Sequence, residues 1–240
     1  MLDKLISTFN KPFDDYEPEL NADGDSKLTE CIKKWGWKWS LNQLNQHARP
    51  DSKVQWTTFE GAERKIWNNL QQGVYYGQMQ NEKRHGFGIV YTTDSGSNPW
   101  LYECEWKEGS PINEGRYIWI VGNEWYKFEG TIDDSYYLNG HGSQHNEDGY
   151  QYQGQWKQGD KHGQGKVIYK DGRSYEGEWQ DNYRHGQGRK TDKDGTYHEG
   201  QWKINGIFSK EVGVHKYYNK EGKLIETKDH GDVVSDSDGE

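Results

Sequence analysis

Aromatic and polar residues alternate along the last third of this chain, and the alternation returns at a fixed step. The segments YQGQW (152–156), YEGEW (175–179) and HEGQW (198–202) follow one another every 23 residues. The segment HGQG (162–165) returns at the same step at 185–188. A fixed period in the range of about 20–50 residues is typical of stacked supersecondary units. The repeat therefore predicts the architecture before any single residue is considered.

Each unit has the pattern of a β-hairpin with one aromatic face. Tyr175, Gly177 and Trp179 are two residues apart, so in an extended strand they share a face, while the glutamates between them point to the other. A polar turn follows, and HGQG opens a second strand. The DG pair at 194–195 is expected to close the unit as a two-residue turn in which both positions have positive φ.

The glycine between the two aromatic residues is expected to leave room for rings from its own and the adjacent repeat. Glycine inside a strand marks such a close approach. A single hairpin cannot bury its rings alone, so neighbouring hairpins must stack. The sequence therefore predicts one long antiparallel sheet, twisted as sheets are.

The pattern Y-x-G-x-W-x-x-G-x-x-H-G-x-G, followed by DG, resembles the MORN repeat (membrane occupation and recognition nexus). Segment 152–172 matches the pattern without a gap. Segment 175–195 departs from it once, at Asn182, where a glycine is usual. The resemblance implies a mostly β fold, an elongated single antiparallel sheet of stacked MORN hairpins.

Weaker copies precede the two clean ones. They begin at Tyr75, Tyr102 and Phe128, and their spacing is less regular. The copy that contains Trp202 stops after this residue, as a terminal cap would, because no His-Gly-x-Gly follows it. The resemblance therefore covers roughly 75–208.

Four regions follow from this pattern. Residues 1–72 form a small mixed N-terminal cap, residues 73–210 the repeat array, residues 211–228 a terminal hairpin, and residues 229–240 an acidic disordered tail.

The cap is predicted to be partly helical and to cover the open end of the sheet. Apolar residues of segment 2–9 have helical spacing, and segment 60–70 has the stripe of a second helix. In contrast, the tryptophans of WGWKW (35–39) alternate as in a strand.

Composition supports a narrow aromatic core. Only 30% of the residues are apolar, but the chain contains 12 Trp and 17 Tyr. Two cysteines imply no disulfide framework. The net charge of −9 argues against nucleic acid as a partner. Neither a signal-peptide pattern nor a membrane-spanning apolar run is present, so we expect a cytoplasmic protein.

Two patterns raise the question of a metal ion. Asn21, Asp23 and Asp25 resemble the start of a calcium loop, but Ile32 stands where the closing Glu should be, which favours an acidic turn. The recurring histidines have no second ligand at a local spacing. They are His85, His162 and His185. We therefore expect no metal and no cofactor.

Nothing in the sequence indicates catalysis. Cys31 and Cys104 have acidic neighbours, which raise a thiol pKa and disfavour a nucleophile. The glycines recur with the repeat and belong to it. No catalytic residues are predicted, and we expect that the chain is not an enzyme.

The sequence predicts a non-catalytic protein–protein interaction scaffold. Aromatic residues of the clean repeats are the candidate partner-binding set, since partly exposed rigid rings can anchor another chain. They are Tyr152, Trp156, Tyr175, Trp179 and Trp202. The alternative is that these rings only stack on one another. The expected partners are other proteins of a larger assembly, and homo-oligomerisation stays open.

The resemblance also suggests a setting and a rival function. Short proteins built almost only of MORN repeats are similar to radial-spoke-head and other ciliary or cytoskeletal scaffolds, which implies the axoneme of a cilium or flagellum. The rival is a peripheral membrane protein that binds phosphoinositides or tethers membranes. Its candidate basic residues are Lys157, Lys161, Lys166, Arg184, Arg189 and Lys190. Acidic residues are interspersed among them, which favours a mixed solvated face.

Overall fold

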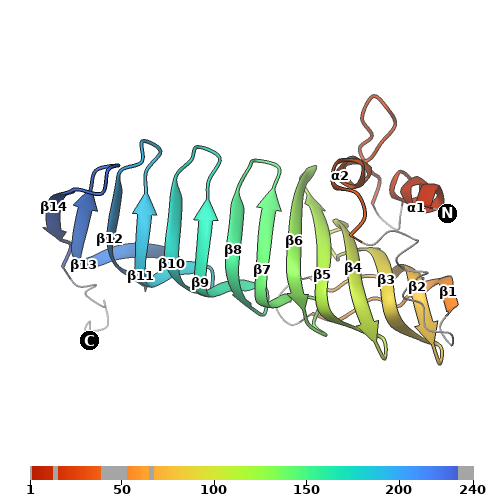
Figure 1. Ribbon diagram of the computed structural model, residues 1–240. Coiled ribbons are helices and arrows are strands. Elements are labelled where there is room, and N and C mark those ends of the chain that lie inside the picture. Colours follow the sequence, from red (N-terminus) through yellow and green to blue (C-terminus); the bar gives the residue numbers. More distant parts are fainter. Residues whose placement is uncertain (1, 13–15, 39–52, 65–67, 232–240) are drawn as a thin grey trace, which may run out of the picture. The chain divides into compact units, whose positions relative to one another are not determined.

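The strands of the chain pair in the order in which they occur in the sequence. The computed structural model describes residues 2–12, 16–38, 53–64 and 68–231. Within these ranges, 14 strands form one sheet with the order β1 to β14, each beside its neighbours in the chain (Figure 1). This confirms the mostly β fold with a single antiparallel sheet. The predicted tail segment 232–240 lies outside the described residues.

The chain divides into two compact units, Met1–Asn139 and Gly140–Glu240. The first contains α1 (Leu2–Phe9), α2 (Lys27–Trp35), β1 (Lys53–Phe59), β2 (Gly73–Gln80), β3 (Lys83–Thr93), β4 (Pro99–Lys107), β5 (Ser110–Val121) and β6 (Glu124–Ile132). Strand β7 (Leu138–Asn146) begins at its end. The second contains β8 (Gln151–Lys157), β9 (Asp160–Ile168), β10 (Ser174–Gln180), β11 (Tyr183–Thr191), β12 (Tyr197–Asn205), β13 (Phe208–Tyr218) and β14 (Leu224–Asp229).

The clean repeat forms the hairpin that the sequence predicts. In β10 and β11, Gly177 lies opposite Gly188, and a bulge follows directly. The connecting turn has positive φ at both Asp181 and Asn182, 49° and 72°. A two-residue hairpin turn needs this conformation, and asparagine tolerates it better than most residues. Asn182 can therefore stand where the repeat pattern usually has glycine.

The DG pair forms a different turn from the one expected. Between β11 and β12, only Gly195 has positive φ, at 88°. The Gly195 N–H donates to the Asp192 carbonyl at 3.0 Å, and the Asp192 N–H donates to Thr196 at 2.8 Å. The connection is therefore a three-residue loop in which a turn is followed by one left-handed residue, another common hairpin geometry.

Glycine is required where two strands and a tyrosine ring meet. A Cβ added to Gly177 would lie 2.5 Å from the Gly188 Cα and 2.9 Å from the Tyr175 hydroxyl. A Cβ added to Gly188 would lie 2.4 Å from the same hydroxyl. Gly154 and Gly165 stand in the same relation to Tyr152 in the preceding repeat. The close approach predicted from the sequence is confirmed.

The N-terminal helices cover a face of the first unit's sheet, not its open end. In Figure 1, α1 and α2 lie on one side of this unit's strands. Their buried side chains form one cluster with strands β3 to β6: Leu5, Phe9, Leu28, Cys31, Ile32, Ile89, Tyr91, Leu101, Ile118, Ile120 and Trp125. By register, Ile89 and Tyr91 stand where the clean repeat has Arg189 and Thr191. Apolar residues at these outward positions need a cover, which the helices supply.

Two local predictions for residues 1–72 are wrong, and one is confirmed. Helix α1 occupies the segment predicted for it. However, Trp35 and Trp37 do not form the predicted strand, since α2 runs to Trp35 and ends at Gly36, whose φ is 69°. Trp39 lies outside the described residues.

The described residues of the second predicted helix, 60–64 and 68–70, are not helical. Ala62 pairs with Leu70 in an antiparallel bridge, and Gly61 has a φ of 90°, which a right-handed helix cannot accommodate. Residues 65–67 of this segment lie outside the described residues. The Arg64 side chain fixes the loop by donating to the Asn68 carbonyl from Nε at 2.7 Å.

A buried ion pair fastens the end of α2 to the sheet. Glu103 and Arg116 are 1% and 3% exposed and contact each other across β4 and β5. Arg116 also donates to the Gly36 carbonyl at 2.7 Å, and the Lys38 backbone N–H donates to the Glu103 carboxylate at 3.0 Å. A buried pair needs such extra hydrogen bonds to offset its desolvation.

Replacing Gly177 should show how tightly the repeats are packed. We expect Gly177→Ala to lower the free energy of unfolding by about 3 kcal/mol, because the new Cβ meets backbone atoms that cannot move aside. Gly172→Asn is the matched control, since a Cβ at Gly172 meets nothing within 4 Å and only its left-handed φ is unfavourable. The control should lose about 1 kcal/mol. Equal losses in chemical denaturation would contradict the packing role.

Removing one partner of the buried ion pair should be more harmful than removing both charges. Arg116→Met leaves the Glu103 carboxylate buried without its counter-ion, which should cost about 3–5 kcal/mol. The double variant Arg116→Met with Glu103→Gln should recover part of this loss. Urea denaturation of the three proteins tests the expectation, and an unchanged Arg116→Met midpoint would refute it.

Candidate functional site

The five predicted partner-binding rings form one continuous ladder in the second unit. Tyr152 contacts Trp156 and Trp179 edge-to-face, with ring centroids 5.1 and 5.4 Å apart. Tyr175 contacts Trp179 and Trp202 in the same way, at 5.2 and 5.1 Å. All five rings are 6% exposed or less. The structure therefore brings the predicted residues together, but as a core and not as the partly exposed surface that we expected.

The polar atoms of these rings also form hydrogen bonds within the protein. The Tyr152 and Tyr175 hydroxyls donate to the carbonyls of Gln155 and Glu178 at 3.0 and 3.1 Å. The Trp179 indole N–H donates to the Gly165 carbonyl of the preceding strand, β9, at 3.1 Å. Burial raises the pKa of Tyr152 and of Tyr175 well above the usual value. Direct partner binding by these rings stays a prediction, and the contacts give them a structural task.

A cation lies over the rings in several repeats. The Lys161 ammonium is 5.2 Å from the Tyr150 ring and 5.5 Å from the Tyr152 ring. The Arg184 guanidinium is 4.8 Å from the Tyr175 ring. Burial lowers the pKa of Lys161 to about 8. Two of the six basic residues considered for lipid binding therefore belong to the aromatic layer.

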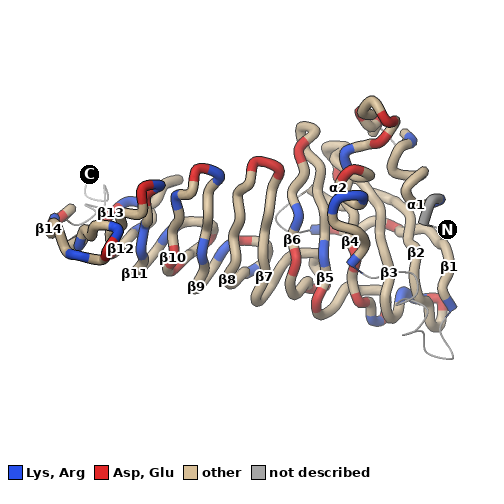
Figure 2. Tube along the Cα trace, turned by 45° about the horizontal axis from the view of Figure 1, so that its top comes forward, with Lys and Arg blue, Asp and Glu red and all other residues tan. Residues whose placement is uncertain are grey.

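Other basic residues of the clean repeats are paired with acids. Lys166 lies 2.9 Å from Glu176, and Arg189 donates to Glu199 at 2.7 Å. Figure 2 shows acidic and basic residues interleaved along β9 to β12. The mixed face expected from the sequence is therefore present. It lacks the clustered unopposed charge that attracts anionic lipid.

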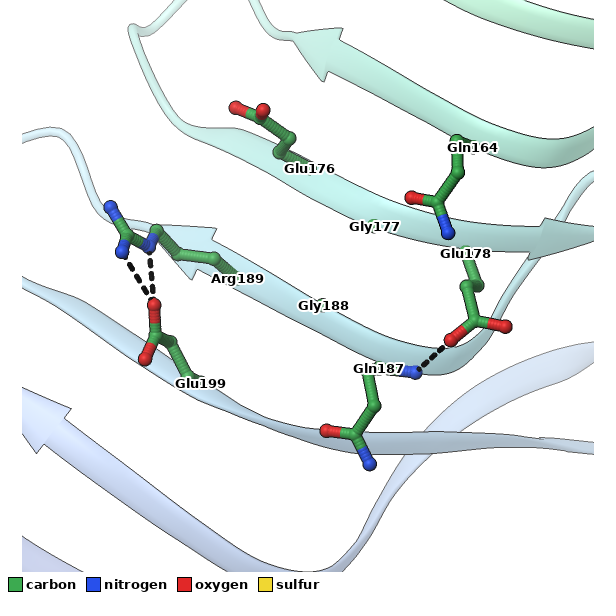
Figure 3. A pocket seen from close by; sticks show the side chains of 8 residues that line it. All are labelled: Gln164, Glu176, Gly177, Glu178, Gln187, Gly188, Arg189 and Glu199. Atoms are coloured by element: carbon green, nitrogen blue, oxygen red, sulfur yellow. Dashed lines mark hydrogen bonds and ion pairs between the residues drawn. The ribbon is translucent and has the colours of Figure 1, made fainter.

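The opposite face of the clean repeats carries an open polar groove of about 540 Å³ (Figure 3). Its floor is the backbone of the facing glycines of β10 and β11, Gly177 and Gly188. Polar side chains from four strands surround this floor: Gln164, Glu176, Glu178, Gln187, Arg189 and Glu199. The sequence placed the two glutamates of β10 toward water. It did not reveal that the facing glycines, which have no side chains, also leave a groove on the polar face.

One side chain of the groove has a structural task that recurs. The Glu178 carboxylate accepts from the Gln187 backbone N–H at 2.8 Å, directly after the bulge glycine Gly186. Gln155 and Gln78 accept from the equivalent N–H groups at 2.7 and 2.8 Å. The bulge is thus satisfied by the same position in three repeats. Of the other groove side chains, Glu176, Arg189 and Glu199 are held only in exposed ion pairs.

The acidic turn near the N-terminus satisfies its own polar groups. The Asn21 side-chain oxygen accepts from the backbone N–H groups of Asp23 and Asp25, at 2.9 and 3.0 Å. Asp25 contacts Lys33, and Ser26 caps α2. That this turn does not bind calcium stays a prediction.

The recurring histidines and the cysteines lie apart from one another. His162 Nδ1 is 3.6 Å from Asp181, and His85 Nδ1 is 3.9 Å from Glu108, each in the turn of the following hairpin. Cys31 and Cys104 are buried, and burial raises the pKa of the Cys104 thiol. In contrast, His198, Glu211 and His215 gather at the last hairpin, a cluster that we did not predict. The even spacing of Glu211 and His215, four residues apart in β13, was the available signal.

The repeated geometry can now be compared with known proteins. A family model described as the MORN repeat matches residues 75–97, 152–172 and 175–197. These three segments are MORN repeats. The MORN repeat is a non-enzymatic module for protein or membrane-lipid interaction. None of the curated proteins compared with this chain matches it. Within the described ranges, no helix has the length and apolar character needed to cross a membrane.

Trp179 should be a stability residue. Trp179→Ala removes a ring held between two tyrosines and should cost about 3–5 kcal/mol in the free energy of unfolding. Phe208→Ala is the control, because Phe208 is 70% exposed and should tolerate the change. Thermal denaturation distinguishes them. If both variants melt like the unaltered chain, Trp179 is not part of the core.

Proposed function

We propose that this chain is a non-catalytic scaffold that holds other proteins on the polar face of its MORN repeats. The observation that carries the proposal is the division of labour between the two faces of the clean repeats. The aromatic rings are buried in internal packing. The groove on the other face instead presents half-exposed charged side chains around the backbone of two facing glycines. A rigid backbone under these side chains reduces the entropy lost on binding.

The expected partner is an extended protein segment with alternating acidic and basic residues. The pairs Lys166–Glu176 and Arg189–Glu199 join neighbouring strands, and all four side chains are about half exposed. Exposed ion pairs contribute only about 0–1 kcal/mol, so charges of a partner can replace them at little cost. Complementary charges then fix the register of the partner on the sheet.

A protein partner fits this surface better than a membrane. Lipid headgroups need several unopposed basic residues close together. Here Lys161 and Arg184 cover rings, and Lys166 and Arg189 are paired with acids.

The axoneme or another cytoskeletal complex is the proposed setting, and its support is the resemblance to short ciliary MORN scaffolds alone. A fluorescent fusion of the full chain in ciliated cells should lie along the axoneme. A signal confined to a membrane would contradict this setting.

Reversing the charge of two glutamates in the groove should distinguish protein binding from lipid binding. We expect Glu176→Lys with Glu199→Lys to lose the proteins that the full chain captures from cell extract and that cross-link to Lys166, which lies beside Glu176. Glu221→Lys with Glu226→Lys is the matched control, since it changes the charge equally at exposed residues outside the groove.

The same proteins are then mixed with phosphoinositide-containing vesicles at physiological salt. Neither the unaltered chain nor the control should co-sediment. The proposal fails if the groove variant keeps its protein partners, or if the unaltered chain binds vesicles and captures no protein.

A further inference from the structure

The hairpin of β12 and β13 is the last one that continues the aromatic layer. This last hairpin keeps the repeat geometry but changes its chemistry. Strands β12 and β13 pair with the same bulged register as β10 and β11: Trp202 faces Glu211, as Trp179 faces Arg184. This corrects the expectation that the last copy stops after Trp202. The two extra residue pairs before the turn hid the match in the sequence, because they lengthen the hairpin.

Three positions of the aromatic layer are exchanged there. Where the clean repeat has Tyr175, Arg184 and Gly188, the last hairpin has His198, Glu211 and His215. A ring, a cation and a glycine are thus replaced by two imidazoles and a carboxylate. The His215 ring lies over Gly200, where an added Cβ would be 2.3 Å from it. The pair of histidines fills the space that one tyrosine fills elsewhere.

The three exchanged side chains converge. One ligand atom from each lies within 4.8 Å of the other two. His198 Nε2 is 3.0 Å from the Glu211 carboxylate. His198 and His215 are 4% and 0% exposed, so they are well shielded from bulk water.

A fourth candidate side chain follows β14. His230 Nε2 is 3.5 Å from Glu211 Oε2, and its ring is 4.9 Å from the His215 ring. His230 is partly exposed and also contacts the Tyr217 hydroxyl at 3.0 Å. Side chains from β12, β13 and the end of β14 therefore meet at one point.

His215 has the hydrogen-bonding pattern of a metal ligand. Its Nε2 lies 3.0 Å from the Gln201 carbonyl, which can only accept, so Nε2 carries the proton. Its Nδ1 then keeps a lone pair, and this atom is buried without a hydrogen-bond partner. Metal-binding histidines typically donate their other ring nitrogen to a carbonyl or carboxylate in this way.

We propose that His198, Glu211 and His215 bind a divalent first-row transition ion, with Zn²⁺ as the test ion, and that His230 completes the site. Imidazole nitrogens with one carboxylate suit zinc, whereas Ca²⁺ and Mg²⁺ prefer all-oxygen shells. Ligand atoms of a tetrahedral zinc site lie about 3.3 Å apart. The distances from Glu211 to His198 and to His230, 3.0 and 3.5 Å, are already close to that spacing.

The ion would close the last edge of the sheet. All residues of β14 are exposed, so this strand has no buried side chain to hold it. Coordination by His230 would tie the end of β14 to the two strands before it. Metal binding of this kind adds directly to the stability of the segment that it links.

Titration of metal-free, tag-free full chain with Zn²⁺ tests the proposal. We expect one ion per chain with a dissociation constant tighter than about 1 μM. Zn²⁺ should raise the melting temperature, and Mg²⁺ or Ca²⁺ should not. Co²⁺ should bind in place of zinc and give the strong visible absorption of a tetrahedral site. No binding, or a weak octahedral cobalt spectrum, would overturn the proposal.

Matched variants locate the ion. Glu211→Gln keeps the side-chain volume, and His230→Ala alters a partly exposed residue, so both should fold and lose at least tenfold in Zn²⁺ affinity. His162→Ala and His185→Ala should keep the affinity of the unaltered chain, because these histidines lie in their own repeats. If the first pair binds zinc as tightly as the second, the ion lies elsewhere and the assignment is wrong.

Discussion

A tyrosine ring packed over a pair of facing glycines is the contact on which the second unit depends. Each ring closes over two backbones with no room for a Cβ, and the Trp179 indole meets two such rings edge-to-face. Edge-to-face pairs contribute about 0.5–1.5 kcal/mol beyond their buried area. Aliphatic residues are scarce in the clean repeats, so these rings take their place as the core. The contact also makes each repeat depend on the next, as in other linear repeat arrays.

The first unit uses the same strand pairing but buries both faces. Its aromatic layer includes Trp100, Tyr102, Tyr117 and Phe128, whose rings pack in series. On the other face, apolar residues replace the charged ones of the clean repeats, and the two helices cover them. Apolar residues at positions that are charged in the clean repeats therefore mark the part of the sheet that the two helices cover. The exchange of Tyr, Arg and Gly for His, Glu and His at the last hairpin is also a departure from the repeat pattern, and it marks a different chemistry.

Much of the fold could be predicted from the sequence because the repeat is governed by local rules. Alternation and glycine placement specify strands and faces, and the 23-residue step specifies their succession. The end of α2 and the loop near Arg64 were mispredicted because contacts distant in the sequence help to decide them. The Arg116 side chain donates to the Gly36 carbonyl, and the Arg64 guanidinium lies over the Trp100 ring. The predicted partner-binding rings were identified as a set, but their burial was not foreseen. Spacing shows which side chains share a face and not how much water reaches it.

The central claim is that the rings of the clean repeats are core and that interaction belongs to the polar face. Hydrogen exchange of the indole N–H groups, followed by NMR, tests it most directly. The Trp179 and Trp106 indoles donate to the backbone carbonyls of Gly165 and Gly88, both at 3.1 Å. If the rings are core, these protons exchange only through large-scale unfolding and are protected to nearly the full stability of the chain. Exchange at the rate of a free indole in the folded protein would show that the aromatic face is open and would contradict the account.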